Sequence, residues 1–257
     1  MHHWTKRLLA LAAPLLLTGC LWGPGRFTSD LVLRKNGSFV IDYRGEIILE
    51  TADSMARQGW QDSMAHCATA EGKDRPCTAP EIAEQKVAFE GKQKDDAHAA
   101  KAFGLPGSDE ESNKAFASKL AKYAGWRSVS YRGKGVYDVD YHFEGRLTQD
   151  FVFPLMPDSN VVIPFIALRR RLDGAVLVNA PALTGGTNMF GPMAQQMGGD
   201  AKASAPSRAQ GRFTIHTDGQ ILTNNSEEGA AADPSGQQLY WTIAPGSNKV
   251  PEALIRL

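Results

Sequence analysis

Two stretches of the chain alternate apolar and polar residues, as half-buried β-strands do. Residues 38–44 alternate directly after an Asn36-Gly37 turn signal, which predicts a hairpin over residues 27–49. Residues 137–144 alternate in the same way after a glycine-containing turn, which predicts a second hairpin over residues 126–147. Each hairpin has one apolar and one polar face, so we expect each to lie against a core on one side only.

Between the hairpins the composition changes. Residues 51–124 are rich in Ala, Glu, Lys and Gln, which favour helices, and we expect helices over residues 53–66, 79–90 and 110–124. The order Thr78-Ala79-Pro80-Glu81 is typical of a helix start, with a capping residue followed by an early proline and an acidic residue. Residues 51–124 are therefore predicted to form a helical insertion.

The second half of the chain returns to strand signals. They lie at residues 161–172, 175–179, 213–217, 221–222 and 239–243. Residues 181–210 are rich in Gly, Ala, Met and Pro, which predicts a flexible loop. This order of elements predicts an α+β fold, with a mostly antiparallel curved sheet and the helical insertion packed on one face. The mature chain is expected to form one domain over residues 27–257.

The first twenty residues have the pattern of a bacterial export signal. Lys6-Arg7 is a positive start, residues 8–17 are apolar, and Leu17-Thr18-Gly19-Cys20 resembles the lipobox of bacterial lipoproteins. The resemblance implies that residues 1–19 are removed and that Cys20 carries fatty acyl chains such as palmitate. An uncleaved membrane anchor is an alternative, but the apolar run is far shorter than the roughly 20 residues that a bilayer of about 30 Å requires. A secretory signal without lipidation is the other alternative.

The lipobox has consequences for location. Residues 20–26 are expected to form a lipidated tether, and six residues reach at most about 20 Å, which keeps the folded body near the membrane. Leu21, rather than an aspartate, follows Cys20. By resemblance to the lipoproteins of enteric-type bacteria, this implies the periplasmic face of the outer membrane.

Charge and cysteine content narrow the function further. The 28 basic and 28 acidic side chains balance, which argues against a nucleic-acid binder. Besides Cys20 the chain has only Cys67 and Cys77, and in an oxidising compartment we expect this pair to form a disulfide. A metal site with His66 is the alternative, but it lacks a fourth ligand at metal spacing. No metal and no cofactor are expected.

Basic side chains at two turns are candidates for contact with lipid headgroups. Arg169 and Arg171 share one face of a strand, and Arg132 and Lys134 lie at the tip of the second hairpin. Together they predict a basic rim that faces the membrane. The alternative is that these are ordinary surface charges, which prevent other strands from pairing with a sheet edge.

Soft apolar side chains gather in the 181–210 segment. Met189, Met193 and Met197 follow one another at intervals of four residues, and Phe190 lies among them. We interpret these residues as an adaptable contact surface for a lipid or a protein partner. A Cu(I) site and a disordered segment are the alternatives.

One predicted strand carries acidic residues and a histidine, which are side chains that catalysis commonly uses. Asp138, Asp140, His142 and Glu144 project from the same face of the second hairpin. An envelope hydrolase or a metal-dependent enzyme using this face is therefore an alternative function. Side chains on one strand do not converge on a single ion, and no nucleophile motif accompanies His142, so we expect a solvated sheet face and no enzyme.

The outline of the chain resembles uncharacterised bacterial lipoproteins of the LppM type. The similar pieces are Leu31-Val32-Leu33 through Gly45-Glu46-Ile47, and residues 219–225 leading to Trp241-Thr242-Ile243. That family has no established catalytic residues, and the resemblance implies an envelope role with contact to lipids or glycolipids. The leading hypothesis is a non-enzymatic, membrane-anchored envelope lipoprotein that binds a lipid, an amphipathic ligand or a protein partner. A purely structural scaffold lipoprotein is a further alternative.

Overall fold

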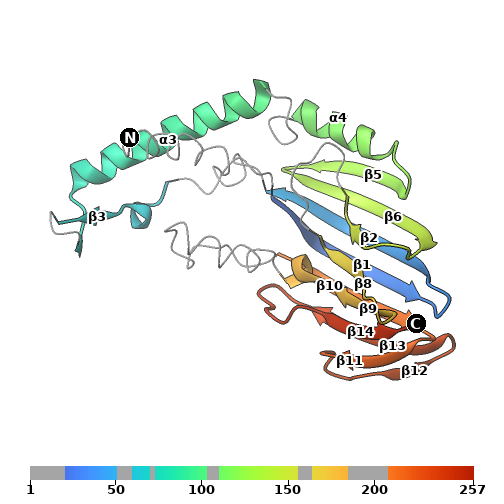
Figure 1. The fold of residues 1–257 in the computed structure, drawn as a ribbon. Coiled ribbons are helices and arrows are strands. Elements are labelled where there is room, and N and C mark those ends of the chain that lie inside the picture. Colours follow the sequence, from blue (N-terminus) through green and yellow to red (C-terminus); the bar gives the residue numbers. More distant parts are fainter. Residues whose placement is uncertain (1–20, 51–59, 70–72, 103–109, 156–163, 185–207) are drawn as a thin grey trace, which may run out of the picture. The chain divides into compact units, whose positions relative to one another are not determined.

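The chain divides into two units, one built almost entirely of β-strands and one that contains a long helix (Figure 1). The computed structural model describes residues 21–50, 60–69, 73–102, 110–155, 164–184 and 208–257. The β-unit comprises Trp22–Leu49 and Phe116–Leu257, and the helical unit includes Glu50–Ala115. The predicted single domain over residues 27–257 is thus divided, and most of the expected insertion belongs to the helical unit.

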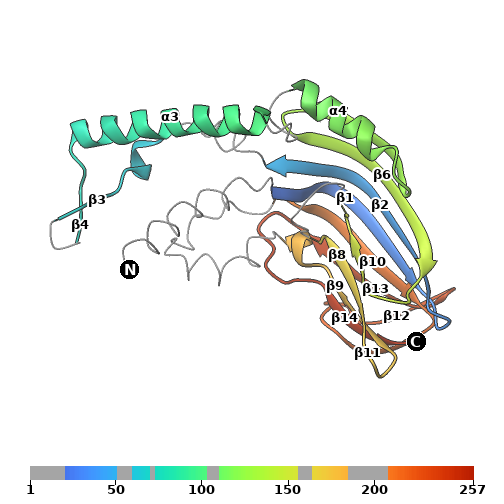
Figure 2. The ribbon, with the colours of Figure 1, turned by 45° about the horizontal axis from the view of Figure 1, so that its top comes forward.

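The larger sheet of the β-unit has seven strands in the order β12-β13-β10-β1-β2-β6-β5. These strands are β1 (Leu21–Leu33), β2 (Ser38–Glu50), β5 (Trp126–Gly133), β6 (Val136–Arg146), β10 (Gln210–Thr217), β12 (Ala231–Asp233) and β13 (Gly236–Ile243). Strands β1 and β10 are parallel, whereas β2, β6 and β5 pair antiparallel, as do β10, β13 and β12. The long strands bend along their length, which gives the sheet its curvature (Figure 2).

A second sheet of five strands has the order β11-β14-β9-β8-β7. Its strands are β7 (Phe151–Phe153), β8 (Ile166–Arg170), β9 (Ala175–Asn179), β11 (Gln220–Asn224) and β14 (Glu252–Arg256). A 3-10 helix, η3 (Pro181–Thr184), follows β9. All of the strand pairs in this sheet for which a register is assigned are antiparallel.

Aromatic side chains join the inner faces of the two sheets. Tyr43 of β2 lies 5.2 Å from Phe153 and 5.9 Å from Phe165, measured between ring centroids, and all three side chains are fully buried. Tyr141 of β6 lies 4.5 Å from Phe153. The β-unit is therefore a sandwich with an aromatic core. The prediction of one sheet is wrong in this respect, because alternation shows that a face is buried but not whether a helix or another sheet covers it.

One helix end also packs on this inner face. Helix α4 (Glu110–Leu120) places Phe116 against Trp22 of β1, with 5.3 Å between the ring centroids, and Phe116 also meets Tyr137 edge-on. Leu120 is buried in the same region. The last turns of α4 thus close the part of the core between β1 and β6.

The predicted hairpins are confirmed, and the first one begins earlier than expected. Strand β1 starts at Leu21, and Trp22 is buried, so residues 21–26 are not a tether. No alternation marks this segment, because Gly23, Pro24 and Gly25 interrupt it. A Cβ on Gly25 would lie 2.7 Å from the carboxylate of Glu46, so the glycine allows β2 to approach closely.

The helical unit contains more than helices. Helix α3 (Ala79–Ala102) extends twelve residues beyond the predicted end at residue 90, while α4 ends four residues before the predicted residue 124. The predicted helix over residues 53–66 lies largely outside the described residues, and its described part holds the 3-10 helix η2 (Asp62–Met64). A small hairpin follows, made of β3 (Cys67–Ala68) and β4 (Asp74–Arg75).

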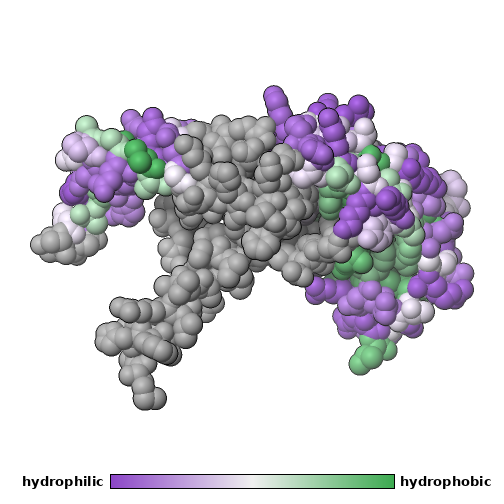
Figure 3. Space-filling model, turned by 90° about the horizontal axis from the view of Figure 1, so that it is seen from above, coloured by the Kyte–Doolittle hydropathy of each residue, from purple (hydrophilic) through white to green (hydrophobic). Residues whose placement is uncertain are grey.

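On the face seen in Figure 3, hydrophilic side chains cover most of the described part of the helical unit. Along the described side chains of α3, no apolar stripe is buried, and Val87 is largely exposed. None of the helices in the described ranges combines the length and the hydropathy that a membrane crossing requires.

Gly45 of β2 supports a close contact with β1 that no other residue fits. Its φ is +143°, and a Cβ would lie 2.1 Å from the carbonyl oxygen of Arg26. Gly45→Ala is therefore expected to lower the free energy of unfolding of the sandwich by about 3 kcal/mol, through backbone strain and forced separation of the strands. Urea unfolding monitored by tryptophan fluorescence measures the change.

The matched control for this prediction is Gly23→Ala in β1, because a Cβ there meets nothing within 4 Å and no positive φ is required. Its effect should stay within about 0.5 kcal/mol. Equal stability of the two variants would contradict the close approach at Gly45.

Candidate functional site

The outer face of the seven-stranded sheet carries the four residues considered for catalysis. Strand register places Asp140 opposite Arg44 and His142 opposite Asp42. His142 Nδ1 lies 2.8 Å from Asp42 Oδ1, and Arg44 Nε lies 3.6 Å from Asp140 Oδ2. The structure thus places Arg44 beside Asp140 and Asp42 beside His142 across β2 and β6, rather than gathering the acids into one cluster.

Asp138 and Glu144, the first and last of these four residues, are paired with a basic residue or exposed to solvent. Arg132 of β5 donates from Nε to Asp138 Oδ2 at 2.8 Å. Glu144 is exposed and lies 3.9 Å from His142 Nε2. Within the described ranges, no group of three or more His, Cys, Asp and Glu residues has the geometry to hold a metal ion. Cross-strand pairing accounts for most of this face, as it does for charged faces of antiparallel sheets.

The two basic turns lie at opposite ends of the sandwich. The β5–β6 turn that contains Lys134 is bonded to the end of β2, where Leu49 N donates to Gly135 O. The β8–β9 turn lies at the other end, because Arg170 Nη1 donates to Leu147 O, and Leu147 N donates to Gly37 O. The prediction that they form one basic rim is wrong, because strand direction, which the sequence pattern does not reveal, separates them.

The two basic turns are separated by about the length of a long strand. Strand β2 is paired with β6 from Ser38 to Ile48, and this length corresponds to about 34 Å at 3.4 Å per residue. Near one turn, Arg132 pairs with Asp138, and in the other, Arg171 pairs with Asp173 at 2.8 Å. Arg169 lies exposed on β8, and Leu172 is fully exposed at the tip of the same hairpin. We call the two ends of the sandwich the Trp22 end and the Gly37 end, after the start of β1 and the β1–β2 turn.

Several chain segments meet at the Trp22 end. Strand β7 runs from Phe151, next to Phe39 near the Gly37 end, to Phe153, next to Tyr43 in the middle of β2. The chain therefore leaves β7 toward the Trp22 end, and Leu155 there is largely exposed. Strand β8 starts and β9 finishes on the same side, because both are antiparallel to their neighbours.

The Met and Phe residues considered for ligand contact fall in a segment whose flanks lie at this end. Met189, Phe190, Met193 and Met197 themselves lie outside the described residues. The segment follows η3 and leads into β10, which begins opposite Arg26 near the start of β1. Both described flanks of this segment thus lie toward the Trp22 end.

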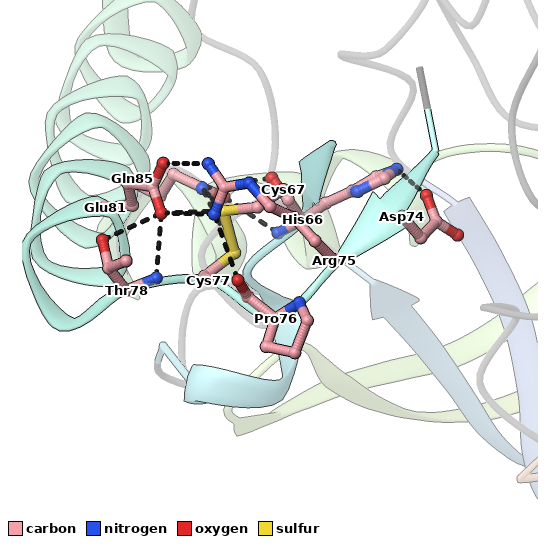
Figure 4. Close-up of a disulfide and its surroundings, with 9 residues drawn as sticks. All are labelled: His66, Cys67, Asp74, Arg75, Pro76, Cys77, Thr78, Glu81 and Gln85. Atoms are coloured by element: carbon pink, nitrogen blue, oxygen red, sulfur yellow. Dashed lines mark hydrogen bonds and ion pairs between the residues drawn. A yellow bond between two sulfur atoms is a disulfide. The ribbon is translucent and has the colours of Figure 1, made fainter. Parts of the chain in front are cut away.

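A disulfide organises the described part of the helical unit (Figure 4). Cys67 and Cys77 are joined, with 5.2 Å between their Cα atoms, which confirms the predicted pair. The side-chain amide of Gln85 of α3 binds both backbone groups of His66. It accepts from His66 N at 3.1 Å and donates to His66 O at 3.2 Å. The bridge and this amide together attach the β3–β4 hairpin to α3, and we call residues 66–85 the disulfide module.

Glu81 completes the module as the acidic residue of a helix cap. Its carboxylate accepts hydrogen bonds from Arg75 Nη1 at 2.9 Å, from Thr78 N at 2.8 Å and from Thr78 Oγ1 at 2.9 Å. The predicted helix start at Thr78 is confirmed. The hydrogen bonds from Arg75 and Thr78 lower the pKa of Glu81 from 4.5 to about 2.

A dependence on pH follows from the lowered pKa of Glu81. Because the pKa in the folded chain is below its value in the unfolded chain, the stabilisation by the ionised carboxylate is complete above pH 4.5 and is lost as the pH falls toward 2. Amide exchange of Thr78 to Gln85, measured at a series of pH values, should show this loss. Glu81→Gln should remove the pH dependence, whereas Glu84→Gln on the same helix should retain it.

Asn225 forms a polar junction that the sequence did not single out as a site. Its Oδ1 accepts from Trp241 Nε1 at 2.9 Å and from Glu252 N at 3.0 Å, and its Nδ2 donates to Val250 O at 2.7 Å. This one side chain links the loop after β11, strand β13 and the start of β14. Asn residues in turns usually bond to their own backbone, so composition gives no signal for such a long-range role.

These features define a class of protein: a two-sheet β-sandwich, joined in the chain to a helical unit that a disulfide closes. No protein-family model matches the sequence, and no curated protein is significantly similar to it. Among solved structures, the chain is similar to the folded domain of the LppM protein of Mycobacterium tuberculosis, determined by NMR, with 13% identity over 91% of each chain and a TM-score of 0.30. A TM-score of this size does not establish a shared fold.

Proposed function

We propose that this chain is a non-enzymatic, lipid-anchored protein of the bacterial envelope whose sandwich is held with its Trp22 end toward the membrane. The observation that carries the proposal is the start of β1 at Leu21, the residue after Cys20. With lipid on Cys20, no spacer separates the acyl chains from a strand of the sandwich, and Trp22 is fixed in the core by Phe116. Two or more acyl chains hold a protein at a bilayer almost irreversibly.

The ligand that this end would meet is a lipid or another amphipathic molecule, or a protein partner at the membrane. The segment with Met189, Phe190, Met193 and Met197 joins the sandwich toward this end. Methionine and phenylalanine side chains adapt to irregular apolar surfaces. Lys134 in the nearby β5–β6 turn is exposed and suits an anionic headgroup. The disulfide supports an oxidising compartment, and Leu21 after Cys20 favours the periplasmic face of the outer membrane.

The anchor is tested by Cys20→Ser and cell fractionation. The variant is expected to leave the membrane fraction, while Cys67→Ser with Cys77→Ser, which retains Cys20, should stay there. A Cys20→Ser protein that partitions as the unaltered protein does would contradict lipidation.

The ligand is tested on protein that begins at Leu21, purified without detergent and extracted with organic solvent. Mass spectrometry is expected to find co-purified lipid, and less of it after Phe190→Ser with Met193→Ser. Absence of lipid, together with no binding to vesicles of anionic phospholipid, would contradict the proposal that the ligand is a lipid. It would not affect the proposal that Cys20 carries the membrane anchor.

A further inference from the structure

Half of one edge of the seven-stranded sheet is open. Strand β12 covers only Gly236–Gln238 of β13, and among the described residues no strand runs beside Leu239–Ile243 on that side. The open part extends over five residues, or about 14 Å from the first to the last at 3.4 Å per residue. It thus has the length of a site for one short strand.

The backbone groups of every second residue on this edge point away from the sheet. Ser226 Oγ donates to Tyr240 O at 3.0 Å from the side opposite β10, so the carbonyl of Tyr240 faces outward. In an antiparallel ladder every second residue points the same way, so Thr242 also presents its N–H and C=O outward. By the same alternation, the N–H and C=O of Trp241 point toward β10, where Phe213 is its register partner. Ser226 already occupies the carbonyl of Tyr240, so the template that this edge offers to an added strand is the outward N–H and C=O of Thr242.

A pocket of about 310 Å³ lies along this edge. Its lining residues are Glu227, Glu228, Tyr240, Trp241, Thr242, Ile243, Ser247, Asn248 and Lys249. One wall comes from the loop before β12 and the other from the loop after β13. The pocket therefore lies between two loops that flank the open strand.

Both walls are held by hydrogen bonds in the free chain. The first is fixed by Ser226 and by Asn225, whose amide group bonds to Trp241 Nε1 and Val250 O. The second is fixed by a turn in which Ala244 N donates to Ser247 Oγ and Ser247 N donates to Ala244 O. A site with fixed walls loses little conformational freedom when a ligand enters.

The charges of the walls indicate what fits. Glu227 and Glu228 are exposed on the first wall, and neither forms an ion pair with another described residue. Lys249 lies on the second wall. Two neighbouring carboxylates attract a lysine or arginine side chain, and the polar, narrow edge does not suit an acyl chain. The ligand chemistry is therefore that of an extended peptide with a basic side chain.

We propose that an extended segment of a partner protein adds to the sheet as a strand beside Tyr240–Thr242, with a basic side chain against Glu227 and Glu228. This interaction does not depend on the lipid anchor or on the Met segment. It gives the envelope protein a second binding surface on the outer edge of its sandwich.

The probe is acetyl-Val-Lys-Val-Lys-Val-amide, added to the mature full-length protein in detergent and followed by NMR. The amide signal of Thr242 is expected to shift on titration, and that of Trp241 to shift much less. The same peptide with N-methyl groups on alternate residues keeps its side chains but cannot pair, and it should bind at least about tenfold more weakly. No binding of the unmodified peptide up to about 1 mM would overturn the proposal.

Protein variants separate backbone pairing from charge. Glu227→Gln with Glu228→Gln should weaken binding about tenfold, whereas Glu144→Gln on the outer face should not change it. Thr242→Pro removes the outward N–H and should abolish binding, whereas Thr242→Val should retain it. If Thr242→Pro does not fold, the N-methyl peptide decides the same question. Equal binding of both peptides, or self-association of the free protein through this edge in sedimentation, would overturn the proposal.

Discussion

Tyr43→Ala is expected to lower the free energy of unfolding of the sandwich by about 3–5 kcal/mol, as other buried aromatic residues do when they are truncated. Tyr43 is fully buried and contacts aromatic rings of both sheets, with Phe27 at 5.7 Å and Phe153 at 5.2 Å. Removal of its ring leaves a cavity where the two sheets meet, so the loss exceeds the transfer free energy of the side chain alone. Urea unfolding followed by tryptophan fluorescence measures it.

Two controls separate packing from hydrogen bonding at this position. Tyr43→Phe removes only the hydroxyl that donates to Glu46 O at 2.7 Å, and should cost about 1 kcal/mol. Tyr123→Ala, at a position that is 45% exposed, should have little effect. A cost below about 1 kcal/mol for Tyr43→Ala would show that the two sheets do not pack face to face around this residue.

Cys67→Ser with Cys77→Ser is expected to destabilise the disulfide module by about 2.5–3 kcal/mol, because the bridge closes a loop of about ten residues in the unfolded chain. The unfolding of the sandwich should not change, because its core residues belong to the other unit. Amide hydrogen exchange reports both regions in one experiment: protection should fall from Thr78 to Gln85 and persist in β2 and β6.

Reduction with dithiothreitol supplies the control for this variant. The unaltered protein should lose the same protection when it is reduced, and the double variant should not respond to the reductant. If the double variant exchanges as slowly as the unaltered protein, then Gln85 and the Arg75–Glu81 ion pair hold the module without the bridge.

Local patterns predicted local structure well. The Asn36-Gly37 turn and the alternation after it specify β2, and Thr78 to Glu81 specify the start of α3. These predictions succeed because each depends on residues within one strand, turn or helix end. The disulfide was also predictable, since Cys67 and Cys77 were the only pair left after Cys20.

Pairing over long distances was not predictable from the same patterns. Residues 21–26 carry no alternation, yet they pair because glycines at 25 and 45 let the backbones approach. The sequence predicted a solvated face for the acidic residues on β6, but it did not reveal that Asp42 and Arg44 lie opposite them. Whether the charged residues of one strand form a cluster or pair across the sheet depends on which residues the neighbouring strand places opposite them.

The direction of the strands determines which of the predicted site residues lie at the same end of the sandwich. The sequence identified Lys134 and Arg169 as members of two basic turns, but it held no information about which end of the sandwich each turn occupies. The bonds from Leu49 to Gly135 and from Arg170 to Leu147 place the turns at opposite ends. Only the Lys134 turn remains beside the start of β1.

The orientation of the sandwich on the membrane is the most direct test of this account. Nitroxide labels on Lys134→Cys and Asn36→Cys, each in the lipidated full-length protein on vesicles, report the distance of the two ends from the bilayer. Neither the acylated Cys20 nor the bridged Cys67 and Cys77 would take the label. We predict that the label at residue 134 lies next to the headgroups and that the label at residue 36 lies about 35 Å farther away. Equal distances, or a label at residue 36 that lies closer to the bilayer, would contradict the account.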